Sequence, residues 1–247
     1  MAVTRLDDFL IRDYLIKILS EGDEFIHDFY NSLLKKSFIF RSFLSKENIP
    51  SLREGDVEIL LKLVFSSRRK YQRIISETGM PRIKEALFGL VYSEESWHNR
   101  INHFYSLIRG IDRKASEDLG SEILHFVYPD KFILWTRWIW DPESETGAVV
   151  FLKEEPPVGG RGREMFGTNY EDFSKIYLQI YETLEEFGIK VKGYLFVDMF
   201  LAMIYATYVD YMTLSTMHSA KGFFPPAGVI ARRLLGVHEP SLLSVEV

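Results

Sequence analysis

The chain has 247 residues, of which 47% are hydrophobic and 15% aromatic, and it contains no cysteine. This composition provides for a sizeable core and excludes intrinsic disorder, disulfides, thiolate zinc sites, iron–sulfur clusters and a cysteine nucleophile. The net charge of −5 excludes a strongly basic protein, but residues 31–113 carry fifteen basic and nine acidic side chains, a net charge of +6. We therefore expect a basic surface only in this part of the chain.

The sequence predicts neither a targeting segment nor a membrane span. Residues 1–17 alternate charged and apolar side chains, unlike a signal peptide. The most apolar stretch, residues 193–209, is short for a spanning helix and carries Asp198 near its middle, which is costly in lipid. We expect a buried core helix there, no membrane contact and a cytoplasmic protein.

Helical periodicity dominates most of the chain. Apolar residues recur three and four positions apart, and Ser, Asp, Asn, Gly and Pro mark the ends of the runs. Asn169 is a candidate N-cap, and Gly188 has the position of a C-terminal glycine. The predicted helices cover about residues 6–18, 23–34, 56–77, 94–110, 117–128, 170–187, 194–217 and 226–235.

The pattern weakens between residues 130 and 168. A short apolar and aromatic run lies between Pro129 and Pro142, and loop-like segments rich in glycine and proline follow it. The sequence therefore predicts an all-α fold, a multi-helix orthogonal bundle with an irregular or short extended segment around 130–168. We expect one domain over residues 1–247, with a weak division at the 154–168 loop as the alternative.

Half of the chain resembles a known group of proteins. The segments DLGSEILHFVYPDKFILWTRW (118–138), TNYEDFSKIYLQIYETLEEFGI (168–189) and FVDMFLAMIY (196–205) follow one another as in uncharacterised all-α proteins of bacteria and archaea. Those proteins in turn resemble the helix-hairpin-helix DNA glycosylases. The resemblance covers about residues 110–205 and implies an all-α fold of that kind.

The catalytic motifs of the glycosylases are not matched. Their glycine-rich hairpin, typically LPGVG, holds DNA phosphates on backbone N–H groups, and the corresponding stretch here is GIDRKASEDLG (110–120). Their catalytic aspartate falls near Thr136, which has no carboxylate, and Asp141 lies five residues further on. The resemblance therefore does not imply base excision, and no catalytic residue is identified.

Polar and aromatic residues gather between positions 125 and 141. An indole beside a guanidinium can stack a base or another planar ligand, and a histidine can serve acid–base chemistry. In the alternative interpretation the histidine is a hydrogen-bonded core residue and the tryptophans pack in the core. The predicted ligand-binding residues are His125, Lys131, Trp135, Arg137 and Asp141.

The densest basic cluster lies in the second quarter of the chain. Its cations suit phosphate contacts, although a solvated helix end explains them equally, because cations are favoured near helix C-termini. The predicted nucleic-acid-binding residues are Arg68, Arg69, Lys70 and Arg73.

The pattern Glu-x-x-His occurs three times, at Glu24/His27, Glu95/His98 and Glu122/His125. On a helix, residues three apart share a face, so each pair offers a carboxylate and an imidazole to one metal ion. Iron, manganese and zinc accept such ligands. The alternative is that Glu24 and Glu95 are first-turn acids favoured by the helix dipole.

These features lead to three functional hypotheses. The first is a non-enzymatic accessory protein that binds nucleic acid or a small anion. The second is a helical-bundle metal protein, an oxidase or hydrolase, built on the Glu-x-x-His pairs. The third is a structural, partner-binding protein that forms a homo-oligomer through its surplus of aromatic residues. The sequence identifies no substrate and leaves open whether the protein is an enzyme.

Overall fold

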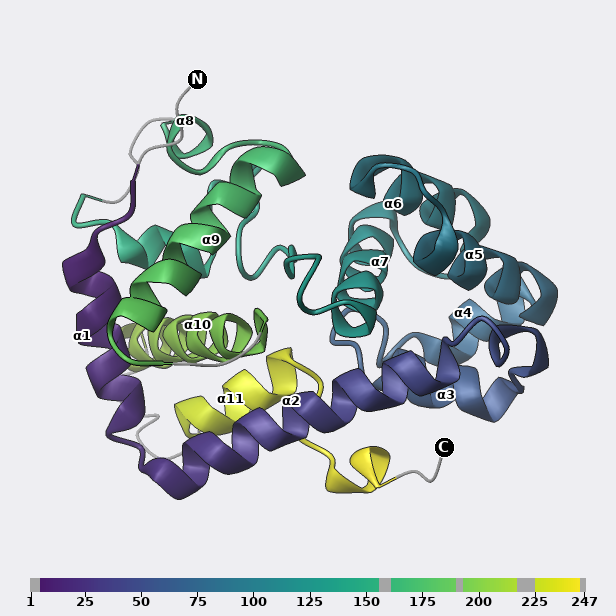
Figure 1. Cartoon of the computed structure of the whole chain (residues 1–247), viewed down its shortest axis with the longest axis horizontal. Coiled ribbons are helices and arrows are strands. Elements are labelled where there is room, and N and C mark those ends of the chain that lie inside the picture. The colour runs from purple at the N-terminus through teal and green to yellow at the C-terminus, as the bar shows by residue number, and fades with distance from the viewer. Residues whose placement is uncertain (1–4, 156–160, 190–192, 217–224, 245–247) are drawn as a thin grey trace. The chain divides into compact units, whose positions relative to one another are not determined.

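The computed structural model describes residues 5–155, 161–189, 193–216 and 225–244, with only the backbone of 210–216. Throughout this part the chain forms α-helices and short 3-10 helices and no strand (Figure 1). The all-α prediction is confirmed. The predicted irregular segment contains an isolated antiparallel bridge between Asp141 and Thr146, followed by η2 (Ala148–Leu152) and α8 (Gly162–Phe166).

Contacts divide the chain into two compact units. Unit 1 comprises Met1–Tyr30 and Arg137–Leu234, and unit 2 comprises Asn31–Thr136 and Leu235–Val247. The first boundary falls within α2 (Asp23–Phe43). The single-domain interpretation stays a prediction, and each unit is described by itself.

Unit 2 is a helical unit with an apolar core. Besides the second part of α2, it contains η1 (Ile49–Ser51), α3 (Glu54–Lys62), α4 (Tyr71–Thr78), α5 (Met80–Tyr92), α6 (Trp97–Leu107), α7 (Arg113–Val127) and η3 (Pro240–Leu243). Helices α5, α6 and α7 pack on one another. Apolar side chains of α3 to α7 enclose a void of only about 10 Å³, which shows how closely this core is filled.

The prediction of one continuous helix over residues 56–77 is wrong, because α3 ends at Lys62 and α4 begins at Tyr71. The hydroxyl of Ser67 donates to the backbone oxygen of Leu61 (2.7 Å). This hydrogen bond occupies a carbonyl at the C-terminal end of α3 and so favours a turn over a continued helix. Helix α5 is not in the predicted set. The sequence places Pro81 beyond the end of the helix before it, but in the structure Pro81 lies in the first turn of α5, where proline is tolerated.

Two helices begin at other caps than the serines that precede the predicted starts, Ser93 before residue 94 and Ser116 before residue 117. Helix α6 is capped by Ser96, whose hydroxyl accepts from the N–H of Asn99 (3.3 Å), and begins three residues later than expected. Helix α7 is capped by Asp112, whose carboxylate accepts from the N–H of Ala115 (2.9 Å), and begins about four residues earlier. Both candidates satisfy the same capping rule, so the sequence alone does not choose between them.

Unit 1 contains the remaining helices. They are α1 (Asp8–Leu19), the start of α2, η2, α8, α9 (Tyr170–Glu186), α10 (Leu195–Thr216) and α11 (Ala227–Leu234). The predicted cap of α9 is confirmed, because the side chain of Asn169 accepts from the N–H of Asp172 (2.8 Å). Gly188 follows the end of α9 with a φ of +93°, as the prediction of a C-terminal glycine requires.

The apolar helix predicted near residues 194–217 is α10. Its residues 195–204 are all buried, as expected of a core helix. Asp198 on this helix is fully buried and accepts a hydrogen bond from the hydroxyl of Tyr177 on α9. Among the described residues, no helix combines the length and the apolar character needed to cross a bilayer.

Candidate nucleic-acid interface

His125 is a core residue in the structure. Its side chain is fully buried, its Nδ1 lies 2.7 Å from the backbone oxygen of Phe132, and its ring meets that of Phe126 edge to face. A carbonyl only seven residues away thus satisfies one ring nitrogen. These contacts are those expected of a core histidine, and the prediction of a ligand site stays a prediction.

The other predicted cleft residues have separate partners. Lys131 is exposed, with its Nζ 5.3 Å from the ring centre of Phe132. Trp135 is half-buried, and its indole stacks on that of Trp97 at a centroid distance of 5.4 Å. Arg137 and Asp141 belong to unit 1, where the backbone N–H of Asp141 donates to the oxygen of Thr146 (2.8 Å).

The Glu-x-x-His pairs do not form a metal centre. All six residues of the three pairs are described, and no group of three or more His, Asp or Glu in the described chain is arranged to hold a metal ion. The pair Glu122/His125 is buried, but its members already have partners within the protein. Glu122 forms an ion pair with Lys36, and the Nδ1 of His125 meets the Phe132 carbonyl.

The residues of the other two pairs are exposed at the surface. His98 is exposed on α6, whereas Glu95 precedes the first residue of that helix, so the two do not share a helical face as the spacing predicts. The carboxylate of Glu95 instead accepts from the side-chain amide of Asn99 (3.0 Å). Glu24 and His27 are both exposed on α2. No further His, Asp or Glu of the described chain completes a site around either pair.

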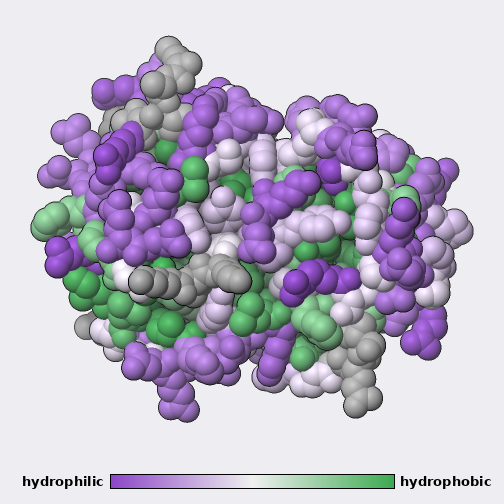
Figure 2. All heavy atoms as spheres, viewed as in Figure 1, coloured by the Kyte–Doolittle hydropathy of each residue, from purple (hydrophilic) through white to green (hydrophobic). Residues whose placement is uncertain are grey.

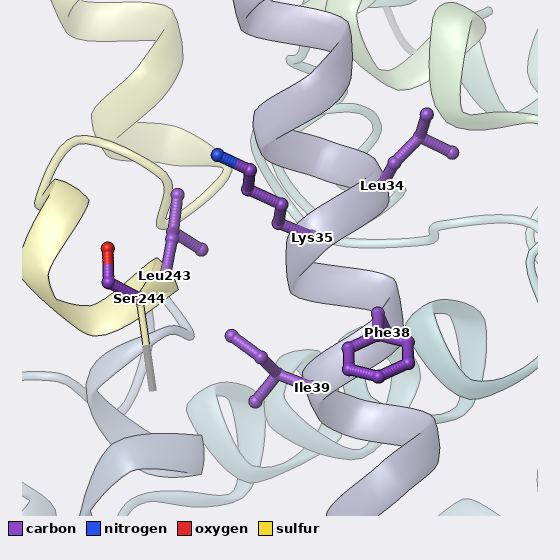
Figure 3. A pocket seen from close by; sticks show the side chains of 6 residues that line it. All are labelled: Leu34, Lys35, Phe38, Ile39, Leu243 and Ser244. Atoms are coloured by element: carbon purple, nitrogen blue, oxygen red, sulfur yellow. The ribbon is translucent and has the colours of Figure 1, made fainter. Parts of the chain in front are cut away.

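An open hollow of about 420 Å³ lies between α2 and η3. Its lining is Leu34, Lys35, Phe38, Ile39, Leu243 and Ser244 (Figure 3). Figure 3 shows the side chains of Lys35 and Ile39 extending from α2 on the side where Leu243 and Ser244 lie. Figure 2 shows that hydrophobic residues also reach the surface elsewhere on the viewed face. The hollow offers one ammonium group, from Lys35, and one hydroxyl, from Ser244, among apolar side chains. These groups do not define a class of ligand.

Two basic segments of unit 2 meet at the α6–α7 turn. Lys70 binds Asp112 through an ion pair (Nζ to Oδ2, 2.7 Å). The hydroxyl of Thr78 accepts from the N–H of Arg109 (2.9 Å). We call the cations of the two segments the basic surface; they are Arg68, Arg69, Lys70, Arg73, Arg109, Arg113 and Lys114.

Gly110 fixes how closely the two segments approach. Its φ is +79°, and a Cβ atom at this position would lie 2.6 Å from the backbone oxygen of Arg73. Only glycine fits both the left-handed backbone and the contact. The α6–α7 turn therefore rests directly on the backbone of α4.

Replacing Gly110 by alanine should lower the free energy of unfolding by about 2 kcal/mol, because the added methyl group meets backbone in a strained conformation. Urea unfolding followed by circular dichroism measures the change. Gly55→Ala is the matched control, since a Cβ there meets nothing within 4 Å. Equal stability of the Gly110→Ala variant and the wild type would contradict the described packing.

The charges of the basic surface are held in exposed pairs. Arg73 binds Glu77 (2.7 Å) and Arg113 binds Glu117 (2.8 Å), each pair one helical turn apart. The hydrogen bond from Lys70, followed by that from the Ala115 N–H, lowers the pKa of Asp112 below its usual range. Exposed pairs of this kind contribute little to stability, so a phosphate can replace the carboxylate at low cost.

The N-terminus of α7 differs from a phosphate-binding hairpin. The carboxylate of Asp112 occupies the backbone N–H of Ala115, the kind of group that holds phosphates in the glycine-rich hairpins. The anion-binding groups that this surface offers are therefore its side-chain cations. Arg109, Arg113 and Lys114 were not among the predicted residues, because the sequence offers no sign that their turn lies beside α4.

The basic surface is the arrangement in unit 2 with the clearest chemistry, since arginine and lysine side chains from two segments are placed together beside solvent. Comparisons with protein-family models, with curated proteins and with solved structures found no match.

Proposed function

We propose that the chain is a non-enzymatic nucleic-acid-binding protein that contacts phosphates through the basic surface. The observation that carries the proposal is the contact between Lys70 and Asp112, together with the packing of Gly110 on Arg73, which join two basic segments. The net charge of residues 31–113 supports it, as does the resemblance of residues 110–205 to uncharacterised proteins that in turn resemble the helix-hairpin-helix DNA glycosylases.

The shape of the surface favours a polyanion over a small anion. A small anion needs donors that converge in a pocket, and these cations line neither the hollow between α2 and η3 nor the void among α3 to α7. The cations instead extend along the α3–α4 connection, α4, the α6–α7 turn and the start of α7. A chain of phosphates engages several of them at once, and guanidinium groups bind phosphate oxygens in pairs.

The proposal is tested with labelled DNA and RNA, single- and double-stranded, at low and physiological salt. Binding should weaken as salt rises, because phosphate contacts release counterions. The double variant Arg69→Ala/Arg73→Ala should lose about tenfold in affinity and reduce the slope of log K against log salt by about 1.5.

Lys17→Ala/Lys175→Ala is the matched control, since it removes two exposed cations of unit 1 and should leave affinity within about twofold. Absence of binding to every nucleic acid at low salt would end the proposal. Equal losses in the two double variants would end the assignment to this surface.

A further inference from the structure

We infer that the basic surface takes single-stranded nucleic acid and reads the faces of its bases with aromatic rings, an inference that rests on the proposed function. Aromatic side chains lie among the cations of the surface. Each of them carries a cationic group over its ring, and the three are Phe65, Tyr71 and Tyr105.

The ring of Phe65 is the most accessible of the three. Phe65 lies in the connection between α3 and α4 and is 41% exposed, although it is one of the largest apolar side chains. The guanidinium of Arg68 lies 4.6 Å from its ring centre. The pair thus presents a flat apolar face beside a group that binds phosphate.

The other two rings continue this arrangement across the surface. Tyr71 is the first residue of α4, and the Nζ of Lys62 lies 4.6 Å from its ring centre. Tyr105 on α6 lies under the guanidinium of Arg113, at 5.6 Å. Tyr71 adjoins Lys70 in sequence, and Lys70 contacts the residue before Arg113, so a ring and a cation occur together in each of the two segments.

A surface that combines aromatic rings with cations should bind a single strand more tightly than a duplex. A duplex offers phosphates but keeps the faces of its bases stacked inside, so the rings would gain no base contact from it. An unpaired strand offers both, because every base has a face that can stack on an aromatic ring and arginine adds a cation–π contact. The carboxylate of Asp112 also repels the phosphates of a rigid duplex, whereas a flexible single strand can place its phosphates away from this carboxylate.

The inference is tested by fluorescence anisotropy on the full chain, with a labelled oligonucleotide alone and annealed to its complement at equal salt. The single strand should bind about tenfold more tightly than the duplex. Phe65→Ala should weaken single-strand binding by about tenfold and duplex binding by less than about twofold, without changing the salt slope, because no charge is removed. Tyr105→Leu should shift the two affinities in the same unequal way.

Phe38→Ala is the matched control, since Phe38 is a more exposed phenylalanine of unit 2, 59% accessible, outside the basic surface. It should leave both affinities unchanged. If single strand and duplex bind equally and Phe65→Ala changes neither, the inference is overturned while the proposed function stands. If neither nucleic acid binds at low salt, the proposed function fails and takes the inference with it.

Discussion

Replacing Lys36 by methionine should lower the free energy of unfolding by about 3–5 kcal/mol. The side chain of Lys36 is fully buried in unit 2, and its ammonium donates to the carboxylate of Glu122 on α7 and to the backbone oxygen of Leu235 (2.8 Å). It also lies 4.0 Å from the ring centre of Phe126. Methionine fills similar space but leaves a buried carboxylate without its counter-charge, which is the costly part of the change.

The double variant Lys36→Met/Glu122→Met separates charge from packing. Because both charges are then absent, the double variant should be more stable than Lys36→Met, with a remaining loss of about 1–3 kcal/mol for the Leu235 carbonyl that loses its donor. Lys35→Met, on the neighbouring exposed lysine, is the control and should change stability by less than about 0.5 kcal/mol. Urea unfolding of the wild type, the single variants Lys36→Met and Glu122→Met and the double variant gives the coupling energy, and additive effects of the two substitutions would contradict a buried pair.

Local signals account for the parts of the fold that could be predicted. Helical periodicity identified α9 and α10, and the cap at Asn169 and the glycine at position 188 fixed the ends of α9, because each depends on residues within one turn. The break between α3 and α4 depends on the orientation of the Ser67 hydroxyl toward Leu61. A serine in an apolar run is compatible with a helix or a turn, so the pattern alone could not decide.

Long-range contacts decide the roles of the charged residues. Lys35 and Lys36 are adjacent in sequence, yet one is exposed and the other fully buried, because the partners of Lys36 lie 86 and 199 residues away. Glu122 is the first of these partners, so the residue that spacing offered as a metal ligand instead neutralises a lysine. Spacing along one helix cannot reveal a partner on another.

The candidate interface also combines residues that the local sequence identifies with residues that only long-range contacts bring beside them. Arg68, Arg69, Lys70 and Arg73 stand out as a local run of positive charge, which any count along the chain detects. The cations near the α6–α7 turn join them through long-range contacts, such as the ion pair between Lys70 and Asp112, 42 residues apart. The predicted cleft around His125 stays without support, because a histidine among apolar residues has the same sequence pattern in a core and in a ligand site.

Replacing Tyr177 by phenylalanine should lower the free energy of unfolding by about 2–3 kcal/mol near neutral pH, because the buried carboxylate of Asp198 loses a hydrogen-bond donor. Tyr181→Phe on the same helix is the matched control. The Tyr181 hydroxyl binds Glu185 at the surface (2.9 Å), so its removal should cost less than about 0.5 kcal/mol.

The same substitution should change how stability depends on alkaline pH. Burial, and after it the charge of Asp198, raises the pKa of Tyr177 well above its ordinary value of 10.0. The folded chain therefore holds this proton more tightly than the unfolded chain, and the stability it contributes is complete below about pH 10 and is lost as pH rises above it. From this residue the wild type should lose about 1.4 kcal/mol of its free energy of unfolding per pH unit above about pH 10.

Urea unfolding at about pH 8 and about pH 11 tests this expectation. The gap in free energy of unfolding between wild type and Tyr177→Phe should shrink by roughly that amount per unit above about pH 10. A gap that stays constant or widens would mean that Tyr177 ionises as readily in the folded chain as in the unfolded one, which a hydroxyl enclosed between α9 and the carboxylate of α10 cannot do.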